Sequence, residues 1–267
     1  MQKRKFLKKI GILYIVTGEY WKFWQNFYES SEKYFLKDCE LHYFIFTDSN
    51  FLLKKSNDKI HTFYMKQREW PFPTLLRYET FFEKQSSYIE MDYLIFCNSN
   101  IMFTKPITFL NLFEDKDLFA TLHPGHAKKN YHQLPFERNE NSLASFKVSK
   151  SSKYLCGGFN GGTRESFLQL IETLMLNINT DLQNNVIAKW HDESHINSYI
   201  NKQIDKFNIL DVSYCYPENR RLNVEKKVLI RDKDKVISIQ HKGILYAIRY
   251  QLIKIIRNTI NYIKDVL

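Results

Sequence analysis

The stretch Ile10-Gly-Ile-Leu-Tyr-Ile-Val16 is an apolar run with the length of a β-strand. An amphipathic pattern over Trp21–Phe35 predicts a helix after it, and apolar runs at Leu41–Thr47 and Ile60–Met65 predict two more strands. Apolar strands that alternate with amphipathic helices are typical of an α/β protein. The first part of the chain therefore predicts an α/β fold.

A polar triplet, Asn98-Ser99-Asn100, ends the next predicted strand. A helix from Thr74 towards Tyr88 leads into the apolar run Tyr93–Cys97, which stops at this triplet. Functional residues of α/β proteins often lie at such strand ends. The second half of the chain predicts a strand at 119–122, a glycine-rich turn at 157–162, a helix from Thr163 and a helix that begins near Glu193.

The size and composition indicate a well-packed globular protein. The chain has 267 residues, of which 44% are hydrophobic and 16% aromatic. This is enough apolar surface for one large domain or two fused halves, and it excludes disordered and fibrous proteins. The 39 Lys and Arg exceed the 29 Asp and Glu, for a net charge of +10. The excess indicates an anionic partner: a phosphorylated small molecule, a nucleic acid or a membrane surface.

The sequence gives no sign of export or of a membrane span. The apolar run at 10–16 is soon followed by Glu19, no cleavage site follows, and no run of about 18 apolar residues occurs. The four cysteines are widely spaced, which argues against a zinc site and a disulfide framework. We therefore expect a reduced, cytoplasmic protein that is soluble or peripheral to a membrane.

Two motifs admit both a functional and a structural interpretation. At Asn98 and Asn100, each amide offers a hard cation one neutral oxygen, which is too little charge for a stable manganese or magnesium site. A plain polar turn is the alternative there. The segment Trp190-His191-Asp192-Glu193-Ser194 places two carboxylates at a predicted helix start. It is either a functional site or an ordinary N-terminal cap, and its successive side chains point in different directions, which argues against a metal cluster.

The glycines and the basic residues of the second half are equally open to two interpretations. The glycines at 157, 158, 161 and 162 fit neither phosphate-loop pattern, so close approach of the backbone to a ligand or a helix is the favoured interpretation. The basic segment 220–235 is either an anion clamp or a solvated face. No nucleic-acid-binding module accompanies it, so we expect no nucleic-acid partner.

Taken in order, a set of motifs resembles glycosyltransferase family 6, the histo-blood-group A and B transferases and their α1,3-galactosyl and N-acetylgalactosaminyl relatives. The resemblance covers roughly residues 10–235. The motifs are Ile-Gly-Ile at 10–12, Tyr43-Phe-Ile-Phe-Thr-Asp48, Trp70, Arg77, His123-Pro-Gly125, Glu137-Arg138, the glycine run and Trp190-His-Asp-Glu-Ser-His-Ile-Asn197.

The resemblance implies a GT-A fold, in which a Rossmann-like nucleotide-sugar-binding half is fused to an acceptor-binding half. It also implies retaining transfer from a UDP sugar to the 3-hydroxyl of an acceptor galactose. Asn98 and Asn100 occupy the place of the family's Asp-x-Asp metal motif, as in bacterial relatives thought to work without metal. We therefore expect a bacterial-type member with no cofactor and no divalent metal.

The resemblance also assigns roles residue by residue. Glu193 matches the proposed nucleophile or cation stabiliser, and Pro135 replaces a hydroxyl residue that touches acceptor in relatives. Acceptor contacts fall on His123, Trp190 and Glu193. Donor contacts fall on Ile15, Val16, Thr17, Tyr20, Trp70, Arg77, Asn98, Asn100, Cys156, Gly157, Gly158, Asp192 and, in a looser register, Arg231, Lys233 and Lys235.

These matches favour an α1,3-N-acetylgalactosaminyltransferase. Gly158 and Gly157 leave room for an acetamido group, so UDP-GalNAc is the expected donor and a β-galactoside, expected to be fucosylated, is the acceptor. A galactosyltransferase that uses UDP-Gal is the alternative within the enzyme class. An inactive sugar-nucleotide-binding protein is the alternative of another class, and the presence of Glu193 argues against it.

The last part of the chain has a composition of its own. We predict a catalytic domain at 1–242 and a C-terminal amphipathic, basic helix at 243–267. Its apolar residues fall on one half of a helical wheel, with Lys and Arg on the other. Such a helix either packs on protein or binds an anionic membrane surface, which would place the enzyme on the inner face of the cytoplasmic membrane.

Overall fold

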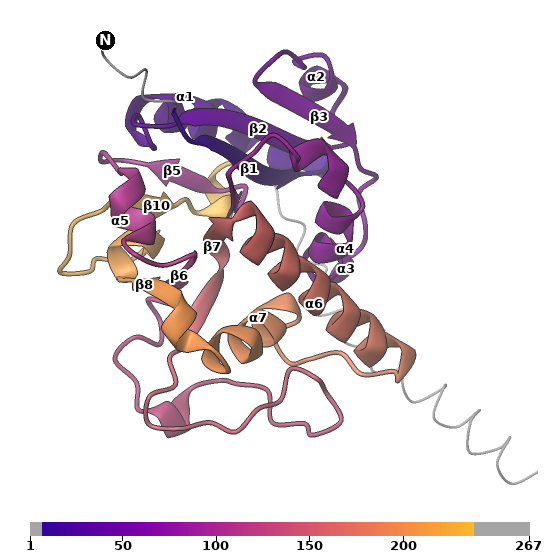
Figure 1. Ribbon diagram of the computed structural model, residues 1–267, viewed down its shortest axis with the longest axis vertical. Helices are drawn as coiled ribbons and strands as arrows, with labels where there is room; N and C mark the ends of the chain where they lie inside the picture. The colour runs from indigo at the N-terminus through magenta and orange to yellow at the C-terminus, as the bar shows by residue number, and fades with distance from the viewer. Residues whose placement is uncertain (1–6, 238–267) are drawn as a thin grey trace, which may run out of the picture. The chain divides into compact units, whose positions relative to one another are not determined.

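The computed structural model describes residues 7–237, and the chain divides into two compact units, 1–232 and 233–267. The first unit contains a seven-stranded sheet with the order β3-β2-β1-β4-β7-β6-β8 and a second sheet with the order β5-β10-β9 (Figure 1). In the large sheet, β1, β2, β3 and β4 are parallel, whereas β7 is antiparallel to both of its neighbours. This mixed α/β architecture confirms the expected fold class and is consistent with a GT-A-like fold.

The elements follow one another closely along the chain. The strands are β1 (Lys9–Val16), β2 (Glu40–Thr47), β3 (Ile60–Tyr64), β4 (Tyr93–Cys97), β5 (Ile101–Phe103), β6 (Leu118–Leu122), β7 (Leu155–Thr163), β8 (Phe207–Leu210), β9 (Tyr216–Pro217) and β10 (Val228–Ile230). The α-helices are α1 (Trp24–Tyr34), α2 (Asn50–Leu53), α3 (Phe72–Leu75), α4 (Arg77–Phe82), α5 (Phe109–Phe113), α6 (Arg164–Gln183) and α7 (Asp192–Asn201). The 3₁₀ helices are η1 (Gly18–Phe23), η2 (Gln85–Tyr88), η3 (Tyr131–Gln133), η4 (Ile204–Lys206), η5 (Val212–Cys215) and η6 (Lys233–Lys235).

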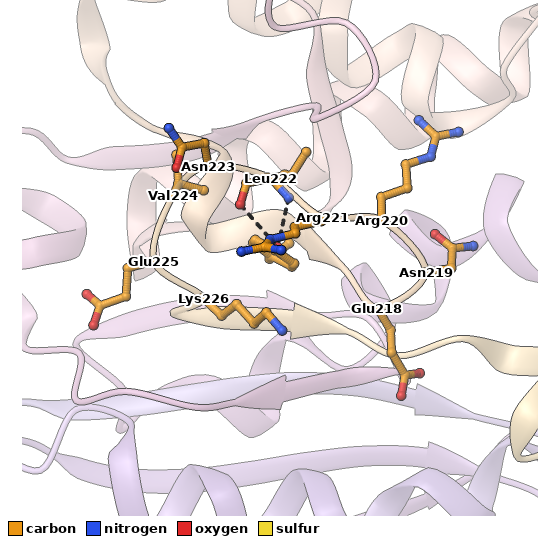
Figure 2. Close-up of a pocket in the computed structure, with 10 residues that line it drawn as sticks. Glu218, Asn219, Arg220, Arg221, Leu222, Asn223, Val224, Glu225 and Lys226 are labelled. Atoms are coloured by element: carbon orange, nitrogen blue, oxygen red, sulfur yellow. Dashed lines mark hydrogen bonds between the residues drawn. The ribbon is translucent and has the colours of Figure 1, made fainter.

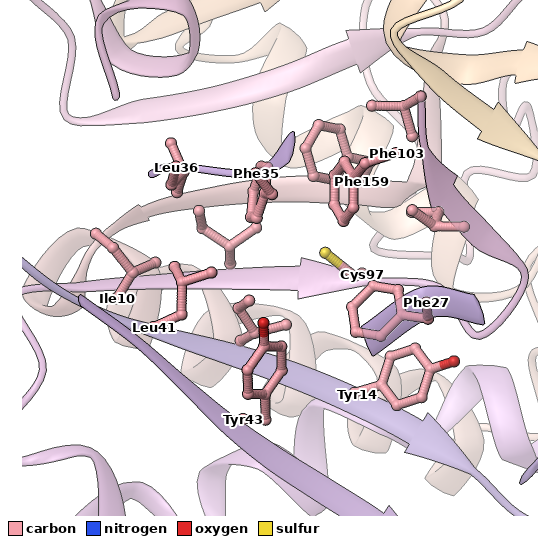
Figure 3. Packing of buried hydrophobic residues seen from close by; sticks show 14 of the residues in the cluster. Ile10, Tyr14, Phe27, Phe35, Leu36, Leu41, Tyr43, Cys97, Phe103 and Phe159 are labelled. Carbon is pink, nitrogen blue, oxygen red and sulfur yellow. The ribbon is translucent and has the colours of Figure 1, made fainter. Parts of the chain in front are cut away.

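The large sheet is covered on both faces at β1, because successive side chains of a strand point to opposite faces and the side chains of β1 after Lys9 are apolar. On one face, Ile12 and Tyr14 pack in a cluster with Phe27 of α1, and the Tyr14 and Phe27 rings stack at 4.2 Å (Figure 3). On the other face, Leu13 belongs to a cluster with residues of α4, α6 and α7, including Phe81. A strand that is apolar on both faces needs helices on both sides, and this sequence supplies them.

Three predicted elements differ from the structure. The predicted helix 21–35 begins as the 3₁₀ helix η1, whose first N–H, from Gly18, donates to both carboxylate oxygens of Asp48. The predicted helix 74–88 is broken into shorter helices, with Leu76 between α3 and α4 outside helical geometry. The predicted glycine-rich turn is wrong, because 157–162 lie inside strand β7.

The glycines of β7 are required by close packing within the sheet rather than by a turn. A Cβ on Gly161 would lie 2.6 Å from the carbonyl oxygen of Leu94, and one on Gly162 would lie 2.4 Å from a methyl carbon of Leu118. Real side chains do not approach so closely. Close backbone approach does occur at these two glycines, but the expectation of a ligand or a helix as the partner is wrong for them, because the partners are neighbouring strands of the sheet.

The second compact unit is described only over 233–237, where η6 forms one turn. The predicted C-terminal helix and the predicted domain boundary at 242 lie outside the described residues, so both stay predictions. Across residues 7–237, no helix combines the length and the apolar composition that crossing a membrane requires.

Candidate active site

Glu193 lies in the first turn of α7, and its carboxylate faces strand β7. Its Oε1 accepts a hydrogen bond from the Tyr154 hydroxyl and its Oε2 accepts one from the Gly157 N–H, each at 2.9 Å. Burial raises the pKa of Glu193, whereas the two hydrogen bonds and the nearby charge of Arg77 lower it. The two donors fix the orientation of the carboxylate and favour its ionised form.

The neighbouring carboxylate, Asp192, forms a buried ion pair with Arg77. Its Oδ2 lies 3.0 Å from the Nη2 of Arg77, whose Nη1 donates to the Gly157 carbonyl at 3.3 Å and whose guanidinium lies over the Phe96 ring. Burial raises the pKa of Asp192 to about 6, and the charge of Arg77 opposes this rise. Arg77 therefore joins β7 to the start of α7 and holds the backbone around Gly157 and Glu193 in place.

The acidic pair does not cap α7, so the interpretation of this segment as an ordinary N-terminal cap is wrong. His191 is the N-cap residue, with a φ of 52°, and no side chain caps the helix. Both carboxylates are turned toward β7 and Arg77, as described above. The exposed ring of Trp70 meets His191 edge-on at 5.0 Å, and Trp190 is also exposed. These two tryptophans offer exposed aromatic surface next to the start of α7, although neither lines the cavity described next.

A cavity of about 320 Å³ lies in front of Glu193 and brings together residues that are far apart in the sequence. Its wall includes Glu193 with His123 from the segment after β6, so two of the three predicted acceptor contacts share one cavity. The full lining is Asn98, His123, Pro124, Gly125, Cys156, Gly158, Glu193, Cys215, Pro217, Asn219, Arg220 and Ile230.

Comparison with known families identifies the family of the chain. A family model for glycosyltransferase family 6 matches residues 2–238. The chain belongs to glycosyltransferase family 6. This confirms the resemblance and the expected enzyme class, a UDP-sugar-dependent glycosyltransferase.

Bacterial and animal members of family 6 are both similar to the chain. The O-antigen biosynthesis glycosyltransferase WbnI of Escherichia coli is 34% identical over 85% of this chain and 95% of its own length. The human globoside alpha-1,3-N-acetylgalactosaminyltransferase 1 is 28% identical over 71% of the chain and 56% of its own length. The rat histo-blood group ABO system transferase 1 is 27% identical over 72% and 56%. The chain thus spans little more than half the length of these animal relatives.

The predicted uridine-binding residues lie at the carboxyl end of β1 and in η1. Val16 and Thr17 are buried, and the Val16 carbonyl already accepts a hydrogen bond from the Thr47 hydroxyl at 2.6 Å. Ile15 and Tyr20 are half-buried and so have accessible side-chain surface. If the nucleotide binds here, the contacts from this end of β1 come mainly from Ile15 and Tyr20.

The side chains of Asn98 and Asn100, at the end of β4, form different hydrogen bonds. The Oδ1 of Asn98 accepts the Ser99 N–H at 3.1 Å. The Nδ2 of Asn100 donates to the carbonyl of Arg231 at 2.7 Å, and the Arg231 N–H donates back to the Asn100 carbonyl at 2.8 Å. A carboxylate at position 100 could not make the first of these bonds, because it has no hydrogen to donate.

The donor set at this strand end does not fit the divalent metal of the family motif. Within 7–237, the Oδ1 of Asn100 is the one amide oxygen of the pair without a hydrogen-bond partner, and it is neutral. Across the same residues, no three His, Cys, Asp or Glu side chains are grouped so that they could share a metal ion. A hard divalent cation prefers several oxygens with negative charge, which these residues do not supply.

The remaining predicted residues divide between the two compact units. Arg231 lies at the end of β10 in the first unit, with its guanidinium 5.6 Å from the centre of the Phe23 ring of η1. Lys233 and Lys235 lie in η6 of the second unit, so their predicted contact with the diphosphate stays a prediction. Sequence reasoning did not assign Tyr154, which bonds Glu193, or Arg220, which lines the cavity.

Proposed function

We propose that this chain is a retaining α1,3-N-acetylgalactosaminyltransferase that moves GalNAc from UDP-GalNAc to the 3-hydroxyl of a β-galactoside. The observation that carries the proposal is the Glu193 carboxylate, which two hydrogen bonds hold at the wall of a cavity that also contains Gly158 and His123. The similarity to the human globoside alpha-1,3-N-acetylgalactosaminyltransferase 1 supports the same reaction.

The proposed reaction needs a negative charge at one end and positive charge at the other. Breaking the bond between sugar and phosphate leaves an oxocarbenium-like carbon, while UDP gains negative charge as it departs. Glu193 meets the cationic carbon, either as a nucleophile that forms a glycosyl intermediate or as a fixed anion during front-face attack. Either route retains the configuration of the sugar.

The choice of GalNAc rests on the space beside Gly158. A Cβ on this residue would lie 3.3 Å from the Cβ of Asn98 and 3.7 Å from its Nδ2, so a methyl group would occupy the gap between β7 and the end of β4. With glycine, this part of the cavity wall has no side chain, and the acetamido group would lie against it. Transfer of galactose from UDP-Gal is the alternative donor reaction.

We also propose that turnover needs no divalent metal. The two asparagines offer little to a hard cation, and fixed cations of the chain would neutralise the diphosphate instead. We propose this role for Arg231, whose guanidinium lies 5.6 Å from the centre of the Phe23 ring of η1.

The test is incubation of the protein with UDP-GalNAc or UDP-Gal, with and without EDTA, against fucosylated and plain β-galactosides. We expect faster transfer of GalNAc, an α1,3 linkage by NMR and an unchanged rate in EDTA. Faster transfer from UDP-Gal would refute UDP-GalNAc as the preferred donor and support the alternative, a galactosyltransferase. A rate abolished by EDTA and restored by manganese would refute metal independence, and hydrolysis or binding without transfer to any galactoside would refute the acceptor.

Peripheral association with an anionic membrane is a further proposal for the segment 243–267. Its support is the sequence pattern alone: Ile-rich on one half of the helical wheel, with Lys and Arg on the other. A glycosyltransferase held in this way would act on a lipid-linked glycan.

A further inference from the structure

The loop between β9 and β10 lines an open pocket of about 810 Å³, which shares Asn219 and Arg220 with the cavity in front of Glu193 (Figure 2). The Tyr216 hydroxyl accepts the Leu222 N–H at 2.8 Å and donates to the Leu222 carbonyl at 3.3 Å, which holds the loop in a defined shape. The charged residues of this loop are Glu218, Arg220, Arg221, Glu225, Lys226 and Lys227.

The anions of the loop already have partners, whereas its arginines have no ionic partner. Glu225 pairs with Lys105 at 3.3 Å, and Glu218 accepts a backbone N–H at 2.6 Å. Arg220 and Arg221 are exposed and form no ion pair with any residue in the described part of the chain. Their charge is therefore available to a ligand, and the fold does not use it.

The position of Arg220 connects the loop to the acceptor side of the active site. Asn219 and Arg220 line both cavities, so the space around the loop continues from the space in front of Glu193. Burial is the main cause that lowers the pKa of His123, and the charge of Arg220 contributes to it. The guanidinium thus acts near His123, a predicted acceptor contact.

We infer that Arg220 and Arg221 form a subsite for an anionic group of the acceptor, a phosphate or a carboxylate carried beyond its terminal galactoside. The inference rests on the proposed function, because it takes the sugar that reacts to lie at Glu193. Neutral hydroxyl groups need no guanidinium, whereas two adjacent guanidinium groups match the paired oxygens of phosphate and carboxylate. Such an acceptor also accounts for basic residues on this side of the enzyme.

The test compares acceptors that share one terminal β-galactoside. One is neutral, one carries a diphosphate at its reducing end and one carries a uronic acid as the next sugar. We expect the wild type to prefer an anionic acceptor by about tenfold or more in kcat/KM, and higher salt to reduce the preference. The arm with the larger preference identifies the anion as phosphate or carboxylate.

The double variant R220Q/R221Q should lose this preference, so that kcat/KM for the anionic acceptors falls to the level of the neutral acceptor in the same variant. The matched control K54Q/K206Q removes two exposed charges elsewhere and should keep it. Equal rates of the wild type on all acceptors would overturn the inference. So would an equal loss on all acceptors in R220Q/R221Q, or a rise in the KM of the UDP sugar, which would assign the arginines to the donor diphosphate.

Direct binding separates this inference from the proposed function. The same three glycans are titrated by calorimetry into the wild type and into R220Q/R221Q, with no donor present. Tighter binding of an anionic glycan that is lost in the variant supports the subsite even if no glycan accepts a sugar, in which case only the proposed reaction fails. Binding that is equal for anionic and neutral glycans overturns the subsite.

Discussion

Replacing Tyr154 with Phe tests how Glu193 is kept ionised. The variant removes one hydroxyl from a buried ring and with it the 2.9 Å hydrogen bond to Oε1, while the Gly157 N–H still donates to Oε2. A hydrogen bond to a charged group is worth about 1.5–3 kcal/mol. Because this bond lowers the pKa of Glu193, its loss adds to the rise that burial already causes.

The loss of this hydrogen bond should lower activity most at acidic pH. In the proposed reaction Glu193 acts as an anion, and a higher pKa leaves a smaller ionised fraction of this carboxylate at acidic pH. In Tyr154→Phe, kcat/KM should fall by about 10- to 100-fold on the acidic side, the equivalent of the lost bond, and by less at higher pH. The acid limb of the pH profile therefore moves to higher pH.

The assay is a pH profile of kcat/KM for wild type, Tyr154→Phe and the control Tyr88→Phe. Tyr88 is also buried, but its hydroxyl donates to the Phe81 carbonyl, so its loss affects stability without touching the site. The other titratable groups around Glu193, which are Asp192, Arg77, the His123 and His126 rings and Cys215, are the same in all three proteins. A loss in Tyr154→Phe that is uniform across pH would refute the reasoning.

Three further predictions concern the reaction and the tail. Glu193→Gln should fold, since its amide can donate to the Tyr154 oxygen and accept from Gly157, but kcat should fall by about 10²-fold or more; a rate near wild type would exclude a catalytic role. Gly158→Ala should lower the kcat/KM ratio of UDP-GalNAc over UDP-Gal by the equivalent of about 1–3 kcal/mol, and an unchanged ratio would contradict the pocket argument. The full chain should sediment with anionic vesicles more than a chain that ends at Lys242, and equal sedimentation of the two would reject membrane binding by the tail.

The strands were predictable because each buried strand is a short, continuous run of apolar residues in the sequence. Ile12, Tyr14, Phe44 and Ile45 are all buried, and runs of such residues on both faces indicate a covered sheet. The same reliance on local sequence gave a wrong prediction for the glycine run at 157–162, which was predicted as a turn. Glycine is the usual turn residue, and only the contacts of Gly161 and Gly162 with adjacent strands explain why these glycines lie in a strand.

The site was predictable as a set of residues but not as a set of contacts. The motif at 190–194 pointed to Glu193, but on local grounds a helix cap was an equal interpretation. The contacts that exclude the cap come from Tyr154 just before β7, from Gly157 on β7 and from Arg77 on α4, all far from Glu193 in sequence. No local pattern carries such information, because the fold alone brings these elements together. Tyr154, beside the glycine run, was the residue that a strand interpretation of β7 would have drawn attention to.

Asn100 stands where the family motif has a metal-binding aspartate, and it also has a structural role. Its amide donates to the Arg231 carbonyl, and the Arg231 N–H donates to its backbone, so the end of β10 is fastened to the end of β4 by two hydrogen bonds. An aspartate there would lose the first bond and place a carboxylate oxygen against a carbonyl oxygen, which is repulsive. In our proposal, the guanidinium of Arg231 neutralises the diphosphate in place of a divalent metal ion from solution. In such an enzyme, charge neutralisation at the diphosphate depends on the contact between β4 and β10 staying closed, and divalent metal concentration has no part in it.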